Sequence, residues 1–161
     1  MLTHPFPPLY NQNSKILILG SFPSVKSREQ MFFYGHPQNR FWKVMSAVFE
    51  CDTPVTIDEK KQFLLEHNVA LWDVIASCEI TGSSDTSIKN VIPNDITEIL
   101  EAADIKQIFV NGKTAEKYYK KYIEDVTGIK AVCLASTSPA NAAWNVERLA
   151  LSWAIIKDFI T

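Results

Sequence analysis

The chain has 161 residues, of which 47% are hydrophobic and 21% charged, with 16 lysines and arginines against 18 aspartates and glutamates. This composition can fill one sizeable core, which excludes a disordered chain, a collagen-like repeat and a small disulfide-stapled scaffold. The formal net charge of -2 argues against a protein that coats nucleic acid through bulk charge. We expect a single domain over residues 1–161.

Cysteine use and hydropathy predict the compartment. Cys51, Cys78 and Cys133 are odd in number and form no C-x-x-C pair, which indicates neither a disulfide framework nor a zinc or redox site. The N-terminus lacks the cationic start and apolar stretch of a signal peptide, and no run approaches the ~18 apolar residues of a membrane span. We therefore expect a cytoplasmic protein, not associated with a membrane, and a monomer.

Acidic residues are concentrated in the middle of the chain. Residues 51–102 hold ten acidic and three basic side chains, whereas residues 1–50 hold two acidic and five basic ones. The C-terminal part is also mildly cationic. A local anion-binding face at the two ends is therefore compatible with the negative total.

Short apolar runs alternate with amphipathic patterns along the chain. Strands are predicted over residues 15–20, 70–75, 107–112 and 130–135. Helices are predicted over residues 40–49, 56–67, 95–103, 113–122 and 141–160, with a capping box at Thr56 and N-caps at Asn94 and Asn141. This alternation predicts a three-layer α/β/α fold with a central parallel sheet of about four strands. In such folds the site lies beyond the carboxyl ends of the strands.

The first of these strand ends opens a long loop, which runs from Gly20-Ser-Phe-Pro-Ser24 to the predicted helix at residue 40. Loops of this length in compact domains are usually functional. Tyr34 offers a ring that can stack on a nucleobase, Asn39 an amide that can read a polar edge, and Arg40 a cation for phosphate. His36 is either a general base or a residue that orients the loop.

Two other strand ends carry weaker signals. The last loop holds Ser136, Thr137, Ser138 and Asn141 before a helix, where hydroxyls and amides can grip phosphate or simply cap the helix. Asp73, near the end of the second predicted strand, could pair with Asp85 for acid–base chemistry. No phosphate-binding, nucleophile-elbow, dinucleotide or zinc-deaminase motif is present, so no metal or cofactor is expected.

Three motifs together resemble the uracil-DNA glycosylase superfamily, and more narrowly its hypoxanthine-DNA (deoxyinosine) glycosylase branch. They are Gly20-Ser-Phe-Pro-Ser24, Tyr34-Gly-His-Pro-Gln-Asn-Arg-Phe-Trp42 and Ser136-Thr-Ser-Pro-Ala-Asn141. The resemblance implies an enzyme that binds damaged double- or single-stranded DNA, flips out a deaminated base and hydrolyses its N-glycosidic bond without metal or cofactor.

The resemblance also implies roles for individual residues. The first motif matches the water-activating loop, but Phe22 stands where many relatives carry a catalytic Asp or Asn, and it cannot position water. The catalytic amide is then expected at Asn39. Tyr34 matches a ring that stacks on the flipped base, and Asp73 lies near a base-reading position.

The remaining positions are expected to contact the base edge or the DNA strand. The backbone amides of Ser21 and Phe22 are expected to polarise the base. The side chains expected to contact DNA are Ser24, Arg40, Ser136, Thr137, Ser138 and Asn141. Ala140 and Asn141 supply no large apolar wedge where some relatives insert one.

Three alternatives stay open on the sequence. The first is a glycosylase of this fold specific for uracil, for mismatches or for another deaminated base such as xanthine. The second is a non-catalytic module that binds unstacked damaged bases, in which Phe22 has replaced the catalytic residue. The third is a nucleoside hydrolase that uses Asp73 and Asp85 as a carboxylate pair.

Overall fold

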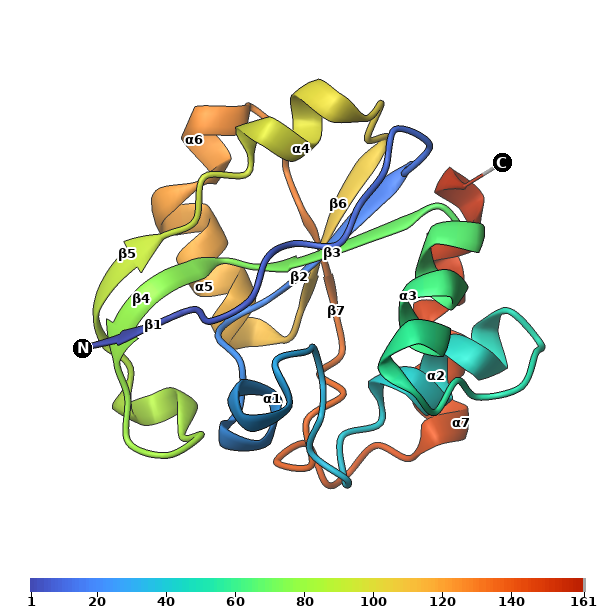
Figure 1. The fold of residues 1–161 in the computed structure, drawn as a ribbon, viewed down its shortest axis with the longest axis horizontal. Coiled ribbons are helices and arrows are strands. Elements are labelled where there is room, and N and C mark those ends of the chain that lie inside the picture. The colour runs from blue at the N-terminus through green and yellow to red at the C-terminus, as the bar shows by residue number, and fades with distance from the viewer. Residues whose placement is uncertain (161) are drawn as a thin grey trace.

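The core of the protein is a four-stranded parallel sheet with the strand order β3-β2-β6-β7 (Figure 1). The computed structural model describes residues 1–160. The strands are β2 (Ile16–Gly20), β3 (Val69–Asp73), β6 (Gln107–Asn111) and β7 (Val132–Leu134). Ile16 to Leu19 of the central strand β2 are fully buried, as expected of a strand covered on both faces. The prediction of a parallel α/β sheet of about four strands is confirmed.

Helices cover both faces of this sheet (Figure 1). The α-helices are α1 (Val25–Gln30), α2 (Phe41–Val48), α3 (Ile57–Glu66), α4 (Thr97–Ala102), α5 (Lys113–Tyr122), α6 (Glu124–Thr127) and α7 (Val146–Trp153). Figure 1 shows α4, α5 and α6 on one side and α2, α3 and α7 on the other. Helix α2 packs on α7 through fully buried side chains such as Phe41 and Trp153. Among residues 1–160, no helix has the length and apolar character needed to cross a membrane.

A second, antiparallel sheet was not predicted. It consists of β1 (Leu2–Thr3), β4 (Ile75–Glu79) and β5 (Lys89–Pro93) in the order β1-β4-β5. The prediction of one strand over residues 70–75 is wrong at its end, because β3 stops at Asp73 and β4 starts at Ile75. The apolar run continues through Val74, so hydropathy alone does not mark the change of sheet.

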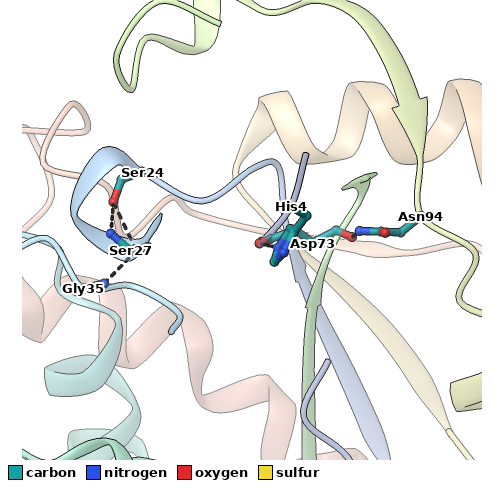
Figure 2. Close-up of polar contacts among 6 residues, drawn as sticks. All are labelled: His4, Ser24, Ser27, Gly35, Asp73 and Asn94. Carbon is teal, nitrogen blue, oxygen red and sulfur yellow. Dashed lines mark hydrogen bonds and ion pairs between the residues drawn. The ribbon is translucent and has the colours of Figure 1, made fainter. Parts of the chain in front are cut away.

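The helix boundaries test the predicted caps. The capping box is confirmed, since the Thr56 side chain and Glu59 exchange hydrogen bonds at the start of α3. The N-caps at Asn94 and Asn141 are wrong. Helix α7 is capped by Asn145 and continues as the 3-10 helix η2 (Ala154–Phe159), so it begins five residues after Asn141. Asn94 instead donates from Nδ2 to the carbonyl oxygen of Asp73 at 2.8 Å (Figure 2).

The strand register brings the carboxyl ends of all four strands to one level. Gly20 at the end of β2 is paired with Asp73 at the end of β3, while Leu19 is paired with Val110, the neighbour of Asn111 in β6. Asn111 is in turn paired with Leu134 of β7. The long loop after β2 and the serine-containing loop after β7 therefore leave the sheet at the same edge.

Candidate active site

A cavity of about 320 Å³ lies at this edge of the sheet. Nine of the eleven predicted site residues line it: Ser21, Phe22, Ser24, Tyr34, Asn39, Asp73, Ser136, Thr137 and Ser138. They come from the ends of three different strands and from both loops. Arg40 and Asn141 do not line the cavity. One cavity thus gathers most of the polar side chains that the sequence singles out.

Asn39 lies just before the N-terminus of helix α2. Its Oδ1 accepts a hydrogen bond from the backbone N–H of Phe41 at 2.9 Å. Because a backbone N–H can pair only with the oxygen, this contact fixes the orientation of the amide. An amide oxygen has two lone pairs, so one acceptor site on Oδ1 and both protons of Nδ2 are left for a ligand or a water molecule.

Tyr34 presents its hydroxyl and one ring face to the site, because its other face is covered. Its ring is stacked on Phe41 with centroids 4.2 Å apart and an interplanar angle of 15°. The backbone of Tyr34 has a φ of 54°, in the left-handed region that non-glycine residues rarely adopt. Loss of water around the hydroxyl and the nearby charge of Asp73 raise the pKa of Tyr34 well above its ordinary value, so the hydroxyl keeps its proton.

Asn111, at the end of β6, connects the two loops and was not predicted as a site residue. Its Nδ2 donates to the Tyr34 hydroxyl at 3.2 Å and to the Thr137 hydroxyl at 3.0 Å. Its Oδ1 accepts from the backbone N–H of Thr137 at 3.1 Å. One amide therefore ties the loop after β2 to the loop after β7. Only its place at a strand end in the sequence points to this role.

Arg40 holds the serine-containing loop through hydrogen bonds to its backbone. Its guanidinium donates to the carbonyl oxygens of Thr137, Ser138, Asn141 and Trp144. These carbonyl oxygens use most of its donors, and a phosphate contact of Arg40 stays a prediction. Arg40 does not line the cavity itself, and it shapes the loop that does.

The polar side chains of this loop largely bind one another. Thr137 is fully buried and its hydroxyl accepts from Asn111, so this hydroxyl is directed inward and away from solvent. Asn141 donates from Nδ2 to the carbonyl oxygen of Ser136 at 3.0 Å. The hydroxyls of Ser136 and Ser138 accept from backbone N–H groups and keep a proton to donate. Of the four residues predicted on DNA here, only Ser136 and Ser138 therefore offer hydroxyls at the cavity.

The loop after β2 is closed by a serine network. Ser24 caps α1 by accepting from the backbone N–H of Ser27, and the two hydroxyls lie 3.1 Å apart (Figure 2). Ser27 in turn accepts from the backbone N–H of Gly35 at 2.9 Å. The side chain of Phe22, in the same loop, is buried, and its ring centroid lies 6.0 Å from that of His4. These contacts hold residues 21–35 against the sheet edge.

Asp73 forms a buried pair with His4. Its Oδ2 lies 2.7 Å from His4 Nε2, and the two side chains are only 5% and 2% exposed (Figure 2). No role for His4 is predicted from the sequence. It is 69 residues before Asp73 in the chain and directly follows β1, a strand that was not predicted. The second sheet explains the contact, because β1 pairs with β4 and delivers His4 to the end of β3.

Two titratable residues at the rim have separate partners. The Nδ1 of His36 accepts from the backbone N–H of Gln38, which supports a loop-shaping role. Desolvation raises the pKa of Asp85, and a hydrogen bond with Thr114 opposes this shift. Asp85 lines the cavity, but the carboxylate of Asp73 is bound to His4 and has no hydrogen bond to Asp85. Residues 1–160 contain no cluster of three His, Cys, Asp or Glu side chains suited to a metal ion.

Replacing Gly20 by alanine should lower the free energy of unfolding by about 1–3 kcal/mol, as overpacking of a core does. An added Cβ would lie 2.5 Å from Asp73 Oδ1 and 2.9 Å from the Tyr34 hydroxyl. The backbone at Gly20 does not require positive φ, so the cost arises from this crowding alone. Urea unfolding measures it, and an unchanged stability would show that the two oxygens do not press on Gly20.

The chain is similar to known proteins over most of its length. The family model of the Uracil DNA glycosylase superfamily matches residues 7–160. A protein from Methanosarcina barkeri named hypoxanthine DNA glycosylase is 32% identical over 138 residues, covering 84% of this chain and 86% of the relative. A protein of the same name from Methanosarcina acetivorans is 32% identical over 150 residues, covering 92% and 94%.

A solved structure shares the whole fold. The solution NMR structure of a provisionally assigned uracil DNA glycosylase from Methanosarcina acetivorans superposes with a TM-score of 0.83 at 28% identity, covering 99% of each chain. The predicted resemblance to the superfamily is therefore confirmed, and it extends over nearly the full length of the chain. The chain belongs to the uracil DNA glycosylase superfamily.

Proposed function

We propose that this protein is a monofunctional DNA glycosylase that removes hypoxanthine from DNA by hydrolysing the N-glycosidic bond. The observation that carries the proposal is the single cavity that gathers Tyr34, Asn39, Asp73 and the serine-containing loop from separate strand ends. Its volume is in the range of small-ligand sites. Two relatives of nearly the same length are named for hypoxanthine.

The chemistry required by this reaction suits the side chains present. Breaking the bond leaves positive charge on the sugar and negative charge on the departing base. Asn39 is a poor proton acceptor, so its role is to position water through the free lone pair of Oδ1. The backbone amides of Ser21 and Phe22 would then polarise the base edge, and no metal or cofactor takes part.

The DNA strand would be held mostly by neutral groups. Ser136 and Ser138 keep hydroxyl protons at the cavity that suit a phosphate of a flipped nucleotide. Ser24 lines the same cavity, but it donates its hydroxyl proton to Ser27, so its proposed part is to shape the loop. Arg40 supports this grip by shaping the loop. We propose that the enzyme acts as a monomer in the cytoplasm on damaged DNA.

The purified protein should remove the base from a duplex that carries deoxyinosine. The resulting abasic site should break only after alkali treatment. Matched duplexes carry deoxyuridine, or an undamaged base, at the same position. Lack of product at both lesions under excess enzyme would overturn the enzymatic proposal, and stoichiometric binding without product would support the damaged-base-binding module. Cleavage of uracil alone would support the uracil-specific alternative. Turnover of free inosine would support the nucleoside hydrolase.

A further inference from the structure

One oxygen of the Asp73 carboxylate is fixed and the other is free. Oδ2 lies 2.7 Å from His4 Nε2. Oδ1 accepts no hydrogen bond from residues 1–160, and Asp73 lines the cavity. A carboxylate oxygen beside a cavity with no donor of its own is an acceptor available to a ligand.

His4 is built to hold this carboxylate in one orientation. Its ring lies among aromatic rings, with centroids 4.5 Å from Phe6, 6.0 Å from Phe22 and 4.4 Å from Trp72. Its Nδ1 is buried and has no hydrogen-bond partner within residues 1–160. A proton on Nδ1 of the neutral ring would be a buried unsatisfied donor, so the proton belongs on Nε2, where it is donated to Asp73.

A hydrogen-bond donor lies beside this acceptor. The Tyr34 hydroxyl accepts from Asn111, and its own proton has no acceptor within residues 1–160. The position of a Cβ on Gly20 would be 2.5 Å from Asp73 Oδ1 and 2.9 Å from the Tyr34 hydroxyl, so the two oxygens flank the same bare stretch of backbone. The end of β2 therefore presents an acceptor and a donor together.

We propose that His4 is the positioning residue of this site. By fixing Oδ2 of Asp73 it directs Oδ1 into the cavity, where Oδ1 and the Tyr34 hydroxyl read the imino N–H and the adjacent carbonyl of a deaminated base. The inference rests on the proposed glycosylase function and names how its substrate is selected. It also gives a role to the N-terminal segment, which β1 and the hydrogen bond from the His4 backbone N–H to Ala76 hold in place.

The pair matches the change that deamination makes. Adenine carries a bare ring nitrogen beside an amino group, whereas hypoxanthine carries an N–H beside a carbonyl. Both hydrogen bonds therefore form with hypoxanthine, whereas in adenine Oδ1 of Asp73 meets a bare ring nitrogen, which has no proton to donate. The Tyr34 hydroxyl can also accept from an amino group, so the rejection of adenine rests on Asp73. The same reversal separates uracil from cytosine. Guanine shares the hypoxanthine edge, so its 2-amino group must be rejected by other contacts.

Replacing His4 by phenylalanine tests the positioning role. The ring still fills the aromatic surroundings, but Asp73 loses its donor and is free to rotate. We expect kcat/KM on deoxyinosine to fall about 10- to 100-fold, the range for loss of a hydrogen bond to a charged group, and the preference for deoxyinosine over deoxyadenosine to fall with it. His4→Gln, whose Nε2 can still donate to Asp73, should restore most of both quantities.

The matched control is Phe6→Leu, which loosens the same aromatic cluster and leaves the donor intact. It should retain the substrate preference of the wild type, whatever its effect on thermal stability. Full activity and preference in His4→Phe would overturn the inference, as would equal losses in Phe6→Leu. Tyr34→Phe, which keeps the stacking on Phe41, should lower kcat/KM about 3- to 10-fold.

The histidine tautomer gives a second measurement, independent of folding of any variant. Nitrogen NMR of histidine-labelled wild-type protein should show His4 protonated at Nε2 and bare at Nδ1, and the opposite tautomer would overturn the inference. Cleavage of deoxyinosine by the wild type tests the proposed function separately. An active wild type with an indifferent His4 would therefore reject only the inference.

Discussion

Replacing Asn39 by alanine should lower the rate of hypoxanthine excision by about 1,000-fold while DNA binding stays measurable. The expected size is that of removing one positioned polar group from a preorganised site. The free lone pair of Asn39 Oδ1 is the proposed water-binding position, and alanine removes it without touching Tyr34 or Asp73. Single-turnover cleavage of a deoxyinosine duplex measures the rate, and gel shift measures binding.

The alanine variant also loses a hydrogen bond at the start of α2, so stability has to be separated from chemistry. Asn39 Oδ1 accepts from the Phe41 N–H at the start of α2, and losing such a hydrogen bond costs about 1 kcal/mol. Thr56→Ala removes the capping box of α3, outside the cavity, and should cause a similar loss of stability with normal activity. Asn39→Asp keeps an acceptor at both positions and should keep measurable activity. Equal inactivity of both Asn39 variants would assign catalysis to the amide protons instead.

The sequence predicts the parts of the fold that depend on a repeated pattern. The apolar runs that end at Gly20 and Asn111 are buried on both faces, so their hydropathy is continuous and strand-like. The boundary at Val74 is not predictable in this way, because a strand that leaves one buried sheet for another stays apolar throughout. Helix α1 was missed because its six residues carry no apolar periodicity.

The location of the site is also predictable, since strand ends in a parallel sheet converge. The partners of each side chain are not. His4 is brought to Asp73 by a two-residue strand pairing, and Asn111 joins two loops through contacts between residues far apart in sequence. Arg40 illustrates the same limit, because charge alone suggests a phosphate contact while geometry directs the guanidinium to carbonyl oxygens of its own protein.

Replacing Asp73 by asparagine should reduce the preference for deoxyinosine over deoxyadenosine by about 100-fold or more. The site then loses its hydrogen bond to the N–H of hypoxanthine and no longer rejects the bare ring nitrogen of adenine. The direction of the new amide follows from His4. Because Nε2 of His4 donates, the oxygen of the introduced amide takes that contact and its NH₂ group replaces Oδ1 at the cavity. Cleavage rates on matched duplexes measure the ratio.

The reversal of the hydrogen-bond pattern depends on the histidine, which makes a combined variant informative. An NH₂ group facing the cavity repels the N–H of hypoxanthine and suits the bare ring nitrogen of adenine. Adding His4→Phe frees the amide to present its oxygen again, so the double variant should recover part of the preference that Asp73→Asn loses. Independent, additive losses would instead mean that His4 does not set the orientation of the side chain at position 73.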